Sequence, residues 1–131
     1  MHVLNLWSAW IGILAGMLVG AGLGLGFQRP GWMGGYGAWS RRLSRLGHIS
    51  FFGLAFVNIA FFLTVDRLAD PSDGLATSLR AASLLLIAGA ATMPVVCFLA
   101  AWREGWRHAF LLPVACLVGG VSSLLFWGVM S

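Results

Sequence analysis

Two histidines stand near the starts of apolar stretches, where their imidazoles could bind the iron of a haem. His48 follows Arg45 by three residues, and His108 directly follows Arg107. In a four-helix bundle with neighbouring helices about 8–10 Å apart, diagonal helices are about 14 Å apart, and two facing imidazoles could ligate haem iron across that gap. Arginines near both histidines would be placed to pair with the haem propionates: Arg41, Arg42, Arg45, Arg103 and Arg107. These residues predict a site for haem b or another tetrapyrrole.

A second interpretation gives the same histidines no chemical role. Histidines near helix ends often lie in the lipid headgroup region, with the ring on apolar groups and its nitrogens toward water. His48 is the stronger candidate for a ligand, because a helix that begins near Ser40 would carry its ring about two turns into the membrane. His108 stays close to the surface in either case, and His2 is expected to be an exposed terminal residue.

Asn58 is predicted to lie about 15 Å along the same helix from His48, near the middle of the bilayer. An amide at this depth needs hydrogen-bond partners, and a neighbouring helix is the usual source. The alternative is a polar contact to a quinone or another ligand, which would make Asn58 part of a cofactor site. A further hypothesis is a channel or carrier for a neutral solute, with Asn58 and a kink at Pro94 lining the path.

Small residues recur at every fourth position in the first apolar stretch, at Gly12, Gly16, Gly20 and Gly24. Residues four apart lie on one face of a helix, and a face of glycines lets another helix approach closely. The stripe therefore predicts close helix packing against a partner helix or a second copy of the chain. A flat cofactor ring could use the same space.

The composition places these residues in a membrane. The chain has 131 residues, of which 60% are hydrophobic and 9% charged, and its mean hydropathy is +0.89. Soluble domains are about 25% charged, and a soluble chain of this length could not cover so much apolar surface. This excludes a soluble globular domain, a disordered chain and a disulfide-rich scaffold. The net charge of +4 does not indicate nucleic-acid binding, because the arginines flank apolar spans. The partner is the lipid bilayer, and we expect a bacterial inner membrane.

Four stretches are long enough to cross a bilayer, which takes about 20 apolar residues. They run over about residues 4–27, 47–65, 77–102 and 109–130, and they predict one transmembrane domain spanning 1–131. The predicted fold is all-α, a four-helix up-and-down bundle. Six arginines lie in the first and third loops, and two lie on the other side, within residues 66–80. The positive-inside rule then places both termini outside.

The tryptophans agree with these boundaries. All seven fall at or near a predicted membrane interface, as an aromatic belt requires: Trp7, Trp10, Trp32, Trp39, Trp102, Trp106 and Trp127.

The sequence favours a non-catalytic small subunit or accessory protein of a larger membrane complex, of a bioenergetic or electron-transfer kind. It contains no nucleophile–histidine–acid set and no charged residue deep within a predicted span. Its glycine-rich first helix would pack against other subunits. The alternatives are a small b-type haem or pigment-binding protein, with His48 and His108 as ring ligands, and a channel or carrier for a neutral solute.

Overall fold

The computed structural model of the chain contains four long helices, and it describes residues 2–68 and 73–130. The helices are α1 (Val3–Phe27), α2 (Trp39–Asp66), α3 (Asp73–Trp102) and α4 (Leu111–Met130). Two short 3-10 segments connect them, η1 (Trp32–Gly34) and η2 (Glu104–Phe110). Four helical segments are long and apolar enough to cross a membrane: Val3–Phe27, Trp39–Asp66, Leu75–Trp102 and Glu104–Phe126. The prediction of an all-α chain with four helices of membrane-spanning length and apolarity is thereby confirmed. Asp70 and the side chain of Trp127 lie outside the described part.

Two helix boundaries differ from the prediction. Helix α2 begins at Trp39, which agrees with the alternative start near Ser40 and lies eight residues before the start of the apolar stretch at residue 47. The added turns are rich in arginine and serine, so their hydropathy is too low to count as part of an apolar span. They are helical nevertheless, because arginine is a good helix former and its methylene groups can lie along the helix. At the other boundary, residues 104–110 form η2 and α4 begins at Leu111. His108 is therefore in η2 rather than in a membrane-spanning α-helix.

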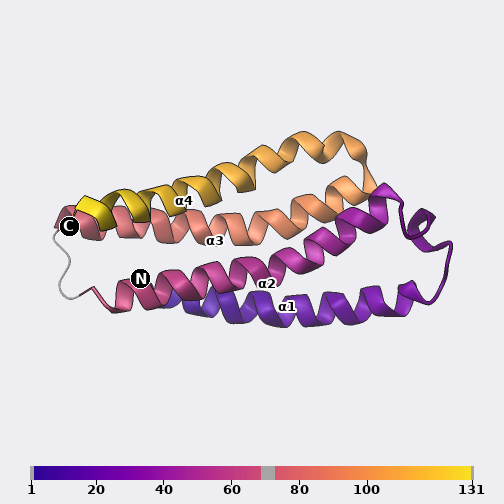
Figure 1. Ribbon diagram of the computed structural model, residues 1–131, viewed down its shortest axis with the longest axis horizontal. Coiled ribbons are helices and arrows are strands. Elements are labelled where there is room, and N and C mark those ends of the chain that lie inside the picture. The colour runs from indigo at the N-terminus through magenta and orange to yellow at the C-terminus, as the bar shows by residue number, and fades with distance from the viewer. Residues whose placement is uncertain (1, 69–72, 131) are drawn as a thin grey trace.

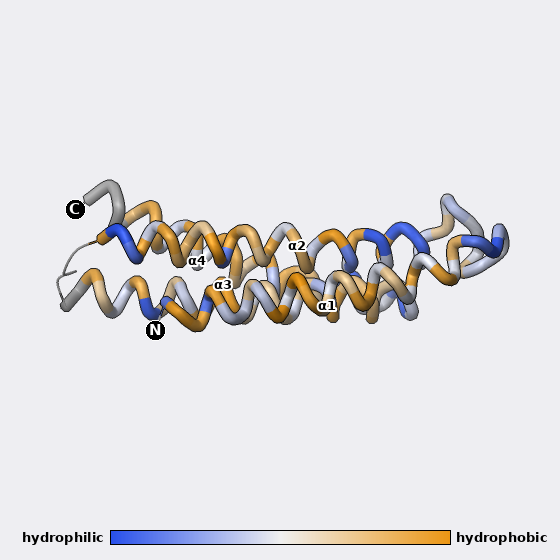
Figure 2. The backbone as a smooth tube through the Cα atoms, turned by 90° about the horizontal axis from the view of Figure 1, so that it is seen from below, coloured by the Kyte–Doolittle hydropathy of each residue, from blue (hydrophilic) through white to orange (hydrophobic). Residues whose placement is uncertain are grey.

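Consecutive helices run in opposite directions and lie in the order α1, α2, α3, α4 across the molecule (Figure 1). Helix α2 packs against α1 and α3, and α4 packs against α3 and η2. Helices α1 and α4 lie at opposite edges, so the bundle is open, whereas in a closed bundle the first and fourth helices are neighbours. We call the end with the two chain termini the terminal end, and the other the connection end. Figure 2 shows hydrophilic residues gathered toward the ends, above all at the α1–α2 connection.

The core lies between α2 and α3. Near the terminal end, Phe61 of α2 is buried in a cluster with residues from α3: Leu75, Leu79, Ala82 and Leu86. At the connection end, Leu43 is buried against Ala100 and Ala101. A Cβ placed on Gly47 would lie 3.0 Å from the Cβ of Cys97, so these two helices approach closely because a glycine stands there.

The start of α2 is joined to the end of α3 by a hydrogen bond from Trp39. Its indole Nε1 donates to the backbone oxygen of Ala100 at 3.1 Å. Trp39→Phe keeps most of the ring and removes the donor, so we expect it to lower the free energy of unfolding by about 0.5–1.5 kcal/mol. Denaturant titration in detergent micelles measures this. An unchanged midpoint would show that the hydrogen bond adds nothing to stability.

Candidate functional site

Three polar side chains meet in the interior where α1, α2 and α3 come together. They are Asn5 of α1, Asn58 of α2 and Ser83 of α3, with exposed fractions of 0%, 0% and 2%. The Nδ2 group of Asn5 donates to Oδ1 of Asn58 at 2.7 Å. The hydroxyl of Ser83 donates to Oδ1 of Asn5 in a very short hydrogen bond. This cluster, called the Asn5–Asn58–Ser83 cluster below, joins three helices through side chains that lipid cannot hydrate.

Both amides of the cluster use their donor and acceptor ends within the protein. Asn58 accepts from Asn5 and donates to the backbone oxygen of Leu54 at 2.9 Å. Asn5 also donates to the backbone oxygen of Ser83, at 3.4 Å. Buried amides satisfied in this way stabilise a helix arrangement. The geometry thus favours a role for Asn58 between helices over contact with a ligand.

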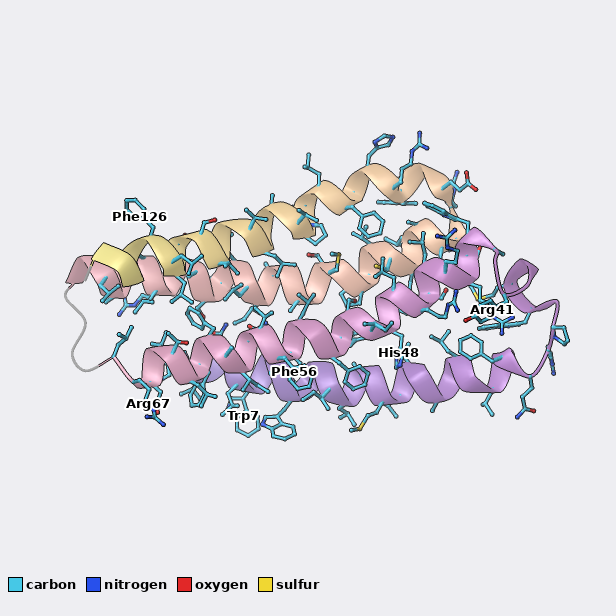
Figure 3. All side chains as sticks on the ribbon, viewed as in Figure 1. Trp7, Arg41, His48, Phe56, Arg67 and Phe126 are labelled. Atoms are coloured by element: carbon cyan, nitrogen blue, oxygen red, sulfur yellow. The ribbon has the colours of Figure 1, made fainter. Side chains whose placement is uncertain are left out.

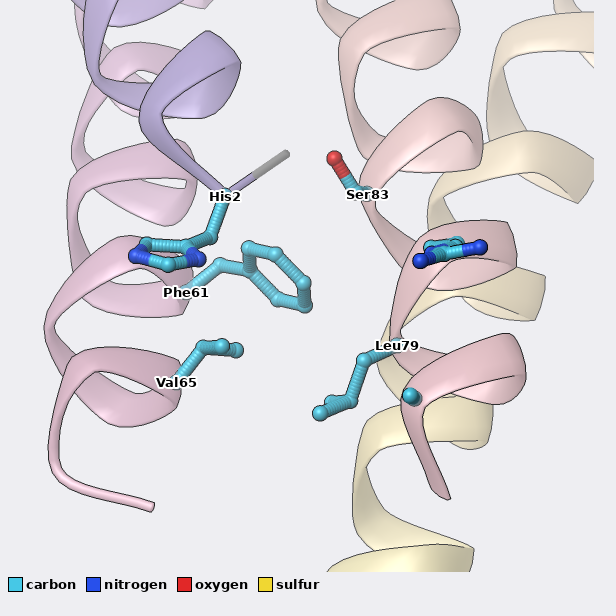
Figure 4. A pocket seen from close by; sticks show the side chains of 7 residues that line it. His2, Phe61, Val65, Leu79 and Ser83 are labelled. Carbon is cyan, nitrogen blue, oxygen red and sulfur yellow. The ribbon is translucent and has the colours of Figure 1, made fainter. Parts of the chain in front are cut away.

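A small cavity adjoins the cluster at the terminal end. It has a volume of about 150 Å³. Figure 4 shows His2, Phe61 and Val65 on one wall and Leu79 and Ser83 on the other. The imidazole of His2 stacks on Phe62 with the ring centroids 5.6 Å apart, so His2 is not a free terminal side chain. Pockets for drug-sized ligands measure about 300–1,000 Å³, so a tetrapyrrole does not fit here.

His48 faces α1 at a glycine. A Cβ placed on Gly20 would lie 2.5 Å from Cε1 of His48, so the ring occupies the space that glycine leaves. Phe52 meets the ring edge-on, at 5.4 Å between centroids. The Nδ1 atom is enclosed and has no hydrogen-bond partner among the described residues. Figure 3 shows His48 between α2 and α1.

His108 lies in a different part of the molecule. It is exposed in η2, and its Nε2 accepts a hydrogen bond from Nε of Arg107 at 3.5 Å. Segment η2 packs against α3 and α4, whereas His48 faces α1. The structure therefore does not bring the two imidazoles together as a haem ligand pair. The expected pairing assumed a closed bundle in which α2 and α4 face each other across the diagonal, and the open order of the helices does not meet that condition.

Arg45 and Arg107, two of the five arginines predicted to pair with haem propionates, also lie in different parts of the molecule. Arg45 lies over the ring of Tyr36, with its Cζ atom 4.3 Å from the centroid. Arg107 is exposed beside His108. Arg45 thus lies on the same helix as His48 and Arg107 lies beside His108, but the two pairs do not form one haem site.

The glycine stripe of α1 packs mostly within the chain. At Gly12, an added Cβ would lie 3.5 Å from the backbone oxygen of Phe51. At Gly16 it would lie 2.8 Å from the ring of Phe52. Together with Gly20, these positions form the contact with α2. Only Gly24 faces open space, with nothing within 4 Å of its added Cβ.

The sequence analysis did not single out Asn5 or Ser83, and it named Arg41 only as a possible partner of a haem propionate, not as a buried residue. A second asparagine in an apolar span was an available signal, because two amides in neighbouring helices satisfy each other well. Ser83 and the burial of Arg41 carry no such signal, since serine is common in spans and arginines at span ends usually reach water.

Comparison of the chain with models of protein families finds no match, and neither does comparison with curated protein sequences or with solved structures.

Proposed function

We propose that this chain is a non-catalytic subunit of a larger membrane complex, and that α4 packs against a membrane-spanning helix of another subunit. The observation that carries the proposal is a groove on α4 that contains a hydroxyl group. The groove has a volume of about 310 Å³ and is lined by Leu117, Val118, Val121 and Ser122.

Ser122 gives this groove its chemistry. It is exposed and stands near the middle of α4, which is the depth of the hydrocarbon if the helix spans the bilayer. A hydroxyl at this depth has no water to bond, and hydrogen bonds between helices are a common way to satisfy it. A helix packed into the groove would supply an acceptor and would fill the recess beside Val118.

The position of α4 at the edge supports the same proposal. Among the described elements, α4 packs against α3 and η2, and its opposite face is exposed. Figure 3 shows the side chain of Phe126 pointing away from the other three helices. The exposed face of α4 is defined by these large side chains: Leu111, Leu112, Val114, Val118, Val121, Leu125 and Phe126.

Helix α1 is the weaker candidate for a partner. Its glycines at 12, 16 and 20 already contact α2. The large side chains on its other side suit lipid acyl chains, since Ile11 and Leu18 are each 67% exposed. We therefore assign the contact with other subunits to α4, although the glycine pattern had favoured α1.

Photo-crosslinking in native membranes tests the proposal. A photoreactive amino acid replaces Val118 on the exposed face of α4, and a matched variant carries it at Leu14, which is similarly exposed on α1. We expect Val118 to form one discrete protein adduct and Leu14 to label lipid. Mass spectrometry of the adduct separates a different subunit from a second copy of this chain. Lipid adducts alone at Val118 would contradict the proposal.

We further propose that the connection end faces the cytoplasm of a bacterial cell and that both termini lie outside. This end holds Arg29, Arg41, Arg42, Arg45, Arg103 and Arg107, as the positive-inside rule requires of a cytoplasmic side. In a background with Cys97 and Cys116 replaced by alanine, Tyr36→Cys tests the orientation, since Tyr36 is 71% exposed. A membrane-impermeant maleimide should label it only after the cells are opened. Labelling of intact spheroplasts would reverse the orientation.

A further inference from the structure

The start of α2 collects positive charge with no acidic residue in the surrounding sequence. Residues 28–46 contain four arginines and no aspartate or glutamate. No acid stands in the first turn of α2, and Ala38 provides no side-chain cap. The first backbone N–H groups of a helix have no partners within the helix, and together they carry partial positive charge. This end of α2 is therefore suited to an anion.

Arg41 is buried at this place. Only 6% of its surface is exposed. Its Nη2 donates to the backbone oxygen of Phe27 at 3.4 Å, and its Cζ lies 4.7 Å from the centroid of the Phe27 ring. Its Nε is enclosed without a hydrogen-bond partner among the described residues. A buried cation whose contacts are the rings of Phe27 and Tyr36 and one carbonyl carries a desolvation cost that an anion would offset.

Arg45 and Arg41 both place a guanidinium over the ring of Tyr36. The Cζ of Arg45 is 4.3 Å from the centroid of Tyr36, and that of Arg41 is 5.6 Å from it. The two guanidinium carbons are therefore no more than about 10 Å apart, within the range at which like charges repel at physiological salt.

The turn before α2 holds Tyr36 in this position. Gly34 and Gly35 have φ values of +81° and +93°, which side chains other than glycine rarely adopt. Trp32 packs on Gly26 at the end of α1, where an added Cβ would lie 2.5 Å from the indole. The arginine pair is thus supported by a defined turn, and Figure 3 shows Arg41 beside it at the connection end.

We propose that Arg41 and Arg45 bind the phosphate of an anionic phospholipid at the start of α2. Guanidinium groups match phosphate with paired hydrogen bonds, and a helix N-terminus adds backbone donors. The end of a membrane-spanning helix lies at the depth of the headgroups, so a lipid phosphate reaches this site without leaving the bilayer. The inference is independent of the role proposed for α4.

Native mass spectrometry of the purified full chain in detergent tests this site. The probes are phosphatidylglycerol, phosphatidylcholine and inorganic phosphate. We expect the chain to retain phosphatidylglycerol in preference to phosphatidylcholine, and we expect Arg41→Gln and Arg45→Gln each to lower that retention about tenfold. Arg107→Gln is the matched control, because Arg107 is an exposed arginine at the same end, and it should leave retention unchanged.

Arg41→Lys separates lipid binding from folding, because it keeps the positive charge and removes the paired N–H donors of the guanidinium. It should retain less phosphatidylglycerol than the wild type while melting within a few degrees of it in lipid-free detergent. Retention unchanged in both glutamine variants, or lowered equally in Arg107→Gln, would overturn the proposal. Displacement of phosphatidylglycerol by an equal concentration of inorganic phosphate would also overturn it, because the ligand would then be a free anion.

Discussion

Replacing Gly16 with leucine is expected to lower the free energy of unfolding by about 1–3 kcal/mol, the usual cost of forcing bulk into a packed interior. An added Cβ at this position would lie 2.8 Å from the Phe52 ring and 3.0 Å from the Cβ of Phe51. The ring can rotate, but the Cβ of Phe51 is fixed to the α2 backbone. Helix α1 must therefore move away from α2, and unfolding by SDS in mixed micelles measures the loss.

Gly24→Leu is the matched control for this prediction. It makes the same chemical change in the same helix, where nothing lies within 4 Å of an added Cβ. Since leucine is the better helix former, this variant should be as stable as the wild type or slightly more so. Equal losses in both variants would mean that α1 does not pack on α2 through the Gly16 face.

Replacing Asn58 with leucine is expected to have the second large effect. The change removes the 2.7 Å acceptor of Asn5 Nδ2 and leaves this group with only the backbone oxygen of Ser83 at 3.4 Å, so one of its N–H donors is buried without a partner. An unsatisfied buried polar group costs about 1–3 kcal/mol. Because Asn5 bonds both Asn58 and Ser83, the loss should loosen the contact among α1, α2 and α3.

A double-mutant cycle isolates this contribution. Asn5→Leu alone should destabilise the protein, but adding it to Asn58→Leu should cost less than it does in the wild type. The coupling between the two residues is expected to reach about 0.6–1.7 kcal/mol, the range found for hydrogen bonds between membrane helices. Strictly additive losses would show that the two amides do not interact.

The four helices were predictable because each contains about 20 apolar residues, which is a strong and local signal. The early start of α2 was reached only as an alternative near Ser40, because Ser40, Arg41 and Arg42 lower the hydropathy of turns that are nevertheless helical. Segment η2 was also missed, since a short connection of mixed polarity carries no signal that separates a 3-10 helix from a loop.

The arrangement of the helices was harder to predict than their existence. In a lipid environment a helix can be apolar on every side, so its hydrophobic pattern does not show which face packs against protein. The glycine stripe showed that one face of α1 is packed, but not that the partner is α2 of the same chain. The prediction of a haem site depended on the missing information, since His48 and His108 could meet only in a closed bundle.

The buried amide was the best indicator of internal contact. Asn58 required a polar partner inside an apolar bundle, and Asn5, in the first turn of α1, is that partner. The Arg41 site could not be predicted in the same way, because its burial depends on how the Phe27 and Tyr36 rings fold back over the start of α2.

The central claim of this account is that α4 lies at an open edge, away from α1, where another subunit can reach it. The most direct test is a distance between spin labels at Leu14 of α1 and Val118 of α4, measured by pulsed electron resonance after Cys97 and Cys116 are replaced by alanine. Packed neighbouring helices are about 8–10 Å apart. Because α3 packs against both α1 and α4, the open arrangement predicts a single distance beyond that of packed neighbours, about 14 Å or more between the helix axes. A separation typical of neighbouring helices would show that the bundle closes and that α4 has no free edge.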